Sequence, residues 1–124
     1  MKLNEYQELS KRTMPKMVEG KHDFYYDDRA KSNYGLGITG EAGEVADYLK
    51  KVIFHQHDLD EVKLKQELGD VLHYVAGLCT MYGFRLEEVA TLNVVKLQER
   101  YPDGFRAEDS IKRKDVKQDY WRDN

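Results

Sequence analysis

One nine-residue pattern occurs twice in this chain, 26 residues apart. The first copy, Glu-Ala-Gly-Glu-Val-Ala-Asp-Tyr-Leu, begins at Glu41, and the second, Glu-Leu-Gly-Asp-Val-Leu-His-Tyr-Val, begins at Glu67. Each copy places two carboxylates at i and i+3 and a tyrosine at i+7, positions that share one face of an α-helix. Each copy therefore predicts a helix with two acids and a tyrosine along one edge.

Two such helices lying side by side would bring four carboxylates together, those of Glu41, Glu44, Glu67 and Asp70. Close like charges repel, so this arrangement costs free energy unless a cation compensates it. A hard divalent cation with oxygen ligands does so, and Mg²⁺ is usual where a phosphate substrate adds ligands. One acidic pair is commonly a solvated helix face, but two matching pairs beside apolar stripes favour a metal site.

The composition limits the kinds of protein this chain can be. Its 124 residues suffice for one domain, and with 40% apolar and 35% charged residues the core is thin, so burial against other copies would stabilise it. A net charge of −3 argues against a nucleic-acid partner, and no apolar run reaches the ~20 residues of a membrane span. The single cysteine, Cys79, and an N-terminus without a signal-peptide segment predict a cytoplasmic protein.

The pattern of apolar residues predicts an all-α fold. Helical periodicity indicates four helices, over about residues 4–13, 30–54, 61–82 and 86–100. Asn4 and Asp60 are expected N-caps, and Gly83 suits the left-handed position after the third helix. We expect a loop or helix entrance around Phe24-Tyr25-Tyr26, and a charged, partly extended tail from Gly104.

Two features predict close contacts that one chain does not easily supply. Gly43 and Gly69 lie in helix interiors, where each costs about 1 kcal/mol relative to alanine, so we expect a helix or ligand to approach closely beside the acids. The fourth helix is apolar on most sides, which predicts burial on most sides and hence an oligomer. Leu92 and Val95 are expected to face another subunit.

Asn93, Lys96 and Arg100 form a row on one side of the fourth helix. They could be a core amide followed by two cations that complement the helix dipole. They could equally hold the phosphates of a metal-bound substrate. Tyr74 is expected to pack with its hydroxyl group accessible, and it could also touch a substrate.

The paired acids resemble a known signature. Glu41-x-x-Glu44, followed by Glu67-x-x-Asp70, is similar to the E-x-x-E…E-x-x-D signature of the MazG-like, all-α nucleoside triphosphate pyrophosphohydrolases. The likeness extends to the surrounding segments, which are Leu3–Gln7, Gly40–Asp47, Glu67–Leu72 and Asn93–Phe105. The resemblance implies a MazG-like helical bundle over residues 1–110, with its core completed by oligomerisation, and a charged tail over residues 111–124.

The resemblance also implies an activity and a site. A nucleoside or deoxynucleoside triphosphate would be cleaved between its α and β phosphates, giving the monophosphate and pyrophosphate, in nucleotide-pool housecleaning. The four acids would bind Mg²⁺, with Mn²⁺ as an alternative, and Glu41 and Glu44 are the catalytic candidates. The substrate would be bound by Tyr74, Asn93, Lys96 and Arg100. Members of the family assemble as dimers or as dimers of dimers.

Other functions remain open at this point. The same site could serve dUTP or dUDP, or phosphoribosyl-ATP. A di-iron or di-manganese carboxylate bundle would need Glu-x-x-His on two helices, and this chain offers only Asp70-x-x-His73. A non-enzymatic helical interaction module would not need four acids beside its core.

Overall fold

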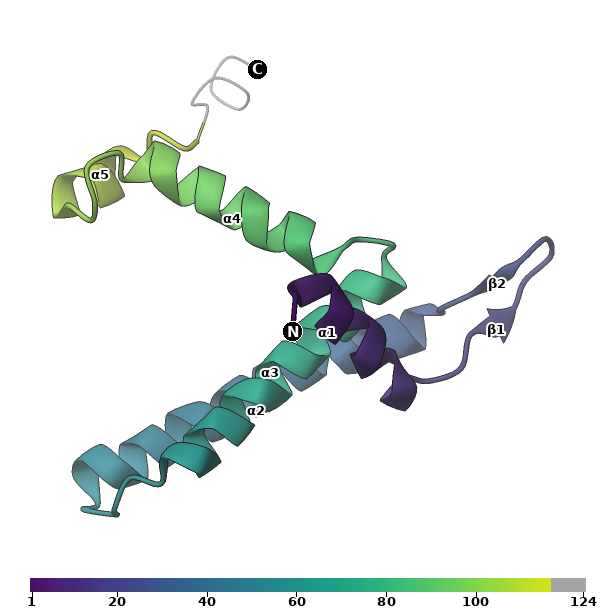
Figure 1. Ribbon diagram of the computed structural model, residues 1–124, viewed down its shortest axis with the longest axis horizontal. Helices are drawn as coiled ribbons and strands as arrows, with labels where there is room; N and C mark the ends of the chain where they lie inside the picture. Colours follow the sequence, from purple (N-terminus) through teal and green to yellow (C-terminus); the bar gives the residue numbers. More distant parts are fainter. Residues whose placement is uncertain (117–124) are drawn as a thin grey trace. The chain divides into compact units, whose positions relative to one another are not determined.

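The computed structural model describes residues 1–116, and these are predominantly α-helical (Figure 1). The chain divides into two compact units, residues 1–86 and the residues that follow. The first unit contains α1 (Leu3–Ser10), a 3₁₀ turn (Lys11–Thr13), β1 (Val18–Glu19), β2 (Phe24–Tyr25), α2 (Asp28–Phe54) and α3 (Glu61–Met81). The second unit contains α4 (Leu86–Arg100), except for its first residue, and α5 (Ala107–Lys112). The all-α prediction is therefore confirmed.

The helix pair α2–α3 forms the body of the first unit, where the two helices lie side by side (Figure 1). Asp27 caps α2, because its side chain accepts a hydrogen bond from the N–H of Ala30. Asp60 caps α3 as predicted, and Gly83 adopts a φ of 72° just beyond its end. Among the described residues, no helix is both long enough and apolar enough to cross a membrane.

At one end of this pair, which we call the inner end, each helix presents a tyrosine to a glycine of the other. The ring of Tyr34 lies against Gly77, and the ring of Tyr74 lies against Gly37. A Cβ atom at either glycine would overlap the facing ring. The two rings also meet edge to face, with centroids 5.0 Å apart. Both helices therefore approach closely here because glycine leaves room for the rings.

The buried side chain of Gln7 fastens α1 to the inner end. Its amide nitrogen donates to the carbonyl of Phe84 at 2.8 Å and to the hydroxyl of Thr80 at 3.1 Å. Its amide oxygen accepts from the N–H of Leu86 at 2.7 Å. A buried amide with its donors and acceptor satisfied stabilises one arrangement of these elements. The hydrophobic core beside it is small and consists of Ala76, Cys79 and Leu86, with Tyr6 and Val75 packed against them.

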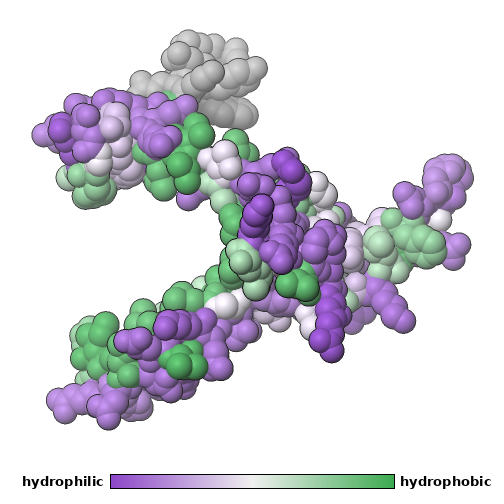
Figure 2. Space-filling model, viewed as in Figure 1, coloured by the Kyte–Doolittle hydropathy of each residue, from purple (hydrophilic) through white to green (hydrophobic). Residues whose placement is uncertain are grey.

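The opposite end of the pair, which we call the outer end, comprises α2 from Tyr48 onward and α3 up to Leu68. The Tyr48 hydroxyl accepts a hydrogen bond from the N–H of Asp60 at 2.8 Å, which ties the two helices together. Beyond this contact on α2, the side chains of Ile53 and Phe54 are 66% and 76% exposed. Further along α3, the side chain of Leu68 is 51% exposed. Figure 2 shows apolar surface over this end of the helices.

Two expectations about local structure were wrong. Phe24 and Tyr25 lie in a short antiparallel hairpin with β1, not in a loop or helix entrance. The N-cap of α1 is Lys2, whose backbone N–H donates to the Glu5 carboxylate at 3.2 Å, in place of Asn4. The tail expected to be partly extended contains one short helix, α5, and the predicted domain boundary at residue 110 stays a prediction. Residues 117–124 of that tail lie outside the described residues.

Within the second unit, α4 has the bounds that its periodicity predicts. Its apolar side chains are exposed, so the burial predicted from its all-round apolar pattern is not provided by the described residues. The exposed side chains are Val89, Leu92, Val94, Val95 and Leu97. The oligomer that would cover them stays a prediction.

Candidate metal centre

Three acids of the repeated pattern converge in the first unit. Glu41 of α2 and Glu67 and Asp70 of α3 each place one carboxylate oxygen within 4.8 Å of the other two. Glu41 and Glu67 are partly buried, whereas Asp70 is exposed. The packing of α2 on α3 thus brings the first acid of one copy against both acids of the other.

The tyrosine–glycine contacts position this cluster. Glu41 lies one helical turn after Gly37, and Asp70 lies one turn before Tyr74, on the same faces. Because the Tyr74 ring rests on Gly37, the distance between the two helices is set one turn away from the acids. The spacing that allows the carboxylates to meet is therefore a consequence of aromatic packing.

No lysine or arginine in residues 1–116 forms an ion pair with the three carboxylates. The nearby Tyr6 of α1 has its pKa raised, mainly by burial and further by the negative charge of Asp70. Sequence reasoning did not propose Tyr6 for the site, although it belongs to the Leu3–Gln7 segment that carries part of the family resemblance. Through Tyr6, α1 therefore lies close enough to the cluster to be affected by the charge of Asp70.

The donor set fits a hard divalent cation. All three groups are carboxylates, which Mg²⁺ and Mn²⁺ prefer over nitrogen or sulfur ligands. No histidine joins this group within the described residues, and the ring of His73 instead lies near those of Tyr34 and Tyr74. The arrangement therefore offers no support for the di-iron alternative through Asp70-x-x-His73.

The three acids lie in a segment that matches a known protein family. The MazG nucleotide pyrophosphohydrolase domain matches residues 29–105, a range that includes all three acids and covers more than half of the chain. The chain belongs to the MazG family. It is also 39% identical over 75 residues to the Gene 37 protein of Mycobacterium phage L5, across 56% of this chain and 64% of that protein. The chain thus spans less than two thirds of that relative, and no solved structure matches it.

Glu44, the remaining acid of the MazG signature, does not belong to the converging group. It is exposed on α2. The pKa of Lys51 is raised mainly by Asp47, whose carboxylate pairs with Lys51 at 2.8 Å and with Lys50 at 3.0 Å, and least by the charge of Glu44. These two lysines hold the pKa of Asp47 at about 2. The role of Glu44 as a metal ligand stays a prediction.

Gly43 and Gly69, which lie between the paired acids, are not approached closely by any other part of the described chain. No atom lies within 4 Å of a Cβ built at Gly43 or at Gly69. The expected close approach at these glycines is therefore absent within residues 1–116, and the space beside them is open. The close approach predicted for Gly43 and Gly69 would therefore have to come from a ligand or from a second copy of the chain.

The predicted substrate residues divide between the two units. Tyr74 of α3 is partly buried and packs as expected. Asn93 and Lys96 are exposed on α4, so Asn93 is not a core amide in this chain. Arg100, at the end of α4, makes a two-pronged ion pair with Asp115 at 2.8 and 2.6 Å. This pair lowers the pKa of Asp115, whose side chain is 2% exposed, so the guanidinium is already engaged.

Proposed function

We propose that this chain hydrolyses a nucleoside or deoxynucleoside triphosphate between the α and β phosphates, with Mg²⁺ as cofactor, releasing the monophosphate and pyrophosphate. The observation that carries the proposal is the convergence of Glu41, Glu67 and Asp70 in a chain of the MazG family. Three unpaired carboxylates at this separation suit a cation that a triphosphate also ligates.

In this proposal the carboxylates bind the metal ion, and one of them also acts as the general base. Glu41, Glu67 and Asp70 hold the ion, and Glu44 joins them from the next turn of α2. Mg²⁺ held by these carboxylates would neutralise phosphate charge and would polarise a water for attack on the α phosphorus. Glu41 or Glu44 accepts the proton that this water loses, as a general base.

The substrate residues act on the phosphates and the nucleoside. Lys96 is exposed and carries a cation that could reach phosphate oxygens without breaking an ion pair described here. Arg100 would first have to exchange the Asp115 carboxylate for a phosphate. Asn93 and Tyr74 complete the proposed set by orienting the substrate. A homo-oligomer, dimer or tetramer, would cover the exposed apolar side chains of α4.

The test is Mg²⁺-dependent pyrophosphate release across a panel of ordinary and modified triphosphates that includes dUTP and phosphoribosyl-ATP. We expect Glu67→Gln and Asp70→Asn to lower kcat/KM by about 10- to 100-fold or more, the scale of a lost charged interaction. Asp47→Asn is the matched control, since it removes an acid from α2 outside the cluster.

Circular dichroism should show the same helical content for all variants, because Asp70 and Asp47 are not core residues. Turnover of dUTP or phosphoribosyl-ATP alone would assign another substrate to the same site. Absence of turnover on every compound, with no divalent ion bound, would favour the interaction module. Near-normal turnover in both cluster variants would refute the site.

A further inference from the structure

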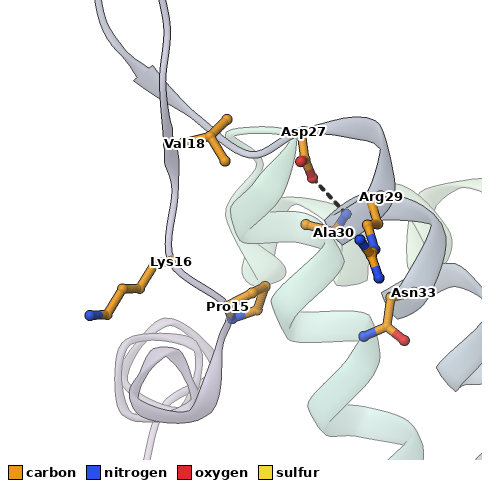
Figure 3. A pocket seen from close by; sticks show the side chains of 7 residues that line it. All are labelled: Pro15, Lys16, Val18, Asp27, Arg29, Ala30 and Asn33. Atoms are coloured by element: carbon orange, nitrogen blue, oxygen red, sulfur yellow. Dashed lines mark hydrogen bonds between the residues drawn. The ribbon is translucent and has the colours of Figure 1, made fainter.

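A cavity of about 440 Å³ lies in the first unit, where the segment leading into β1 passes the first turns of α2 (Figure 3). A cavity of this volume falls within the range of small-molecule sites in proteins. None of the acids of the metal centre lines it. The cavity is therefore a feature that the proposed reaction does not explain.

The polar groups that line this cavity are mainly hydrogen-bond donors. Arg29 and Asn33 lie one turn apart on α2 and project from the same side of it (Figure 3). Arg29 pairs with no carboxylate among the described residues. The one acid of the lining, Asp27, already accepts a hydrogen bond from Ala30 as the cap of α2. A ligand that satisfies this lining must bring acceptors and negative charge.

The remaining lining is apolar or cationic. Pro15, Val18 and Ala30 provide apolar walls. Lys16 also lines the cavity, but Figure 3 shows its side chain extending away from α2, so the donors for a ligand there are Arg29 and Asn33. Apolar walls next to a guanidinium and an amide suit a small organic molecule that carries a phosphate, since the walls would contact its uncharged part.

The cavity is separate from the metal centre. Arg29 precedes Glu41 by 12 residues on the same helix, which corresponds to about 18 Å along the axis and about 120° around it. A ligand held by Arg29 therefore does not need the carboxylates of Glu41, Glu67 and Asp70. This separation allows the two sites to be tested independently.

We propose that this cavity is a second ligand site, which binds a small phosphorylated organic molecule through Arg29 and Asn33. The phosphate accepts hydrogen bonds from the guanidinium and the amide, and the organic part lies against Pro15 and Val18. The site goes beyond the proposed hydrolysis, because it needs neither a metal nor turnover.

Calorimetric titration of the full chain with adenosine monophosphate, and separately with inorganic phosphate, tests this site. EDTA is present throughout, so that binding through a metal ion is removed. We expect the monophosphate to bind at one site per chain and more tightly than phosphate does. Arg29→Gln should weaken it by about tenfold or more, the scale of a lost charged hydrogen bond. Asn33→Ala, a second variant at an exposed position, should weaken it as well.

Two controls make the result specific. Arg12→Gln removes an exposed guanidinium from the neighbouring 3₁₀ turn, and Glu67→Gln removes a charge from the metal centre; neither should alter binding. The proposal is overturned if neither compound binds at millimolar concentration, or if Arg29→Gln and Asn33→Ala bind like the wild type. The proposal is also overturned if Arg12→Gln weakens binding of the monophosphate as much as Arg29→Gln does, or if Glu67→Gln abolishes binding. If the monophosphate and inorganic phosphate bind with equal affinity, the proposed role of the apolar walls is overturned.

Discussion

The inner and outer ends of the α2–α3 pair are built differently, although the same two helices form both. At the inner end, Tyr34 and Tyr74 fit against glycines of the opposite helix, and Gln7 adds α1 as a cover. At the outer end, Ile53 and Phe54 are largely exposed, and a hydrogen bond between the Tyr48 hydroxyl and the backbone of Asp60 helps to join the helices. The chain therefore packs α1 and two ring–glycine contacts at the inner end, although Leu36 is still 71% exposed there, and within the described residues it leaves Ile53 and Phe54 exposed at the outer end.

This difference shows which part of the fold is self-sufficient. Burying a large apolar side chain stabilises a protein by about 1.5–3 kcal/mol, so an exposed Phe54 forgoes that stabilisation unless another molecule covers it. The metal centre lies where the outer end adjoins the inner end, and Asp70 is one turn from the Tyr74–Gly37 contact. Its geometry consequently depends on the inner end, whereas assembly is expected to depend on the outer end and on α4.

The largest effect is expected at the outer end. Ile53→Glu combined with Phe54→Glu would place two uncompensated charges in an interface, which is strongly unfavourable. If a second copy covers this end, sedimentation velocity should show an oligomer for the wild type and monomer or unfolded chain for the double variant. Leu92→Glu with Val95→Glu applies the same test to α4.

The control for this prediction is Lys65→Glu, at a position on α3 where the side chain is 75% exposed and forms only a long ion pair with Glu61. This variant should sediment like the wild type. A wild type that is monomeric at all concentrations, or a double variant with an unchanged oligomer, would show that the outer end needs no partner.

A smaller effect is expected from alanine at the inner end. Gly77→Ala would force the Tyr34 ring to move, and overpacking of this kind costs about 1–3 kcal/mol, partly offset by the ~1 kcal/mol that alanine gains in a helix. Gly69→Ala on the same helix meets no atom within 4 Å, so it should raise stability by up to about 1 kcal/mol. Urea unfolding of both variants measures the difference, and equal effects would contradict the proposed packing.

The smallest effect concerns the exposed ion pairs of Asp47. Its pKa is lowered from 3.8 to about 2 by Lys51 and Lys50, so the pairs stabilise the fold above pH 3.8 and lose their effect as the pH falls towards 2. Wild type should melt slightly above Asp47→Asn at neutral pH, since exposed pairs contribute little. The gap in Tm should close between pH 4 and pH 2, and a gap that is independent of pH would exclude the carboxylate as its source.

The helices could be predicted from the sequence because their signals are local. Apolar periodicity defined α2, α3 and α4 to within about two residues, and Asp60 and Gly83 mark the ends of α3 as expected. The hairpin could not be predicted, because strands of two residues show no periodicity. The helical C-terminal segment was missed for a similar reason, since a helix of six residues in which only Ala107 and Ile111 are apolar gives little periodic pattern.

From the sequence, the site could be predicted only as two helices that each carry a pair of acids along one edge. Which carboxylates meet depends on the register of α2 against α3, and the Tyr34–Gly77 and Tyr74–Gly37 contacts set that register across 37 to 43 residues of sequence. With this register Glu41 meets the acids of α3, while Glu44, about 60° further around α2, does not join the group. Nothing in the local sequence around Gly37 or Gly77 distinguishes them from other helix glycines.

The central claim is that Glu41, Glu67 and Asp70 hold a divalent cation. Titration with Mn²⁺, followed by the electron paramagnetic resonance of the free ion, measures this directly, because Mn²⁺ shares the oxygen preference of Mg²⁺. We predict at least one bound ion per wild-type chain, affinity weakened by about tenfold or more in Glu67→Gln, and unchanged affinity in Asp47→Asn. Equal affinity in the wild type and Glu67→Gln, or no binding by the wild type, would contradict the account.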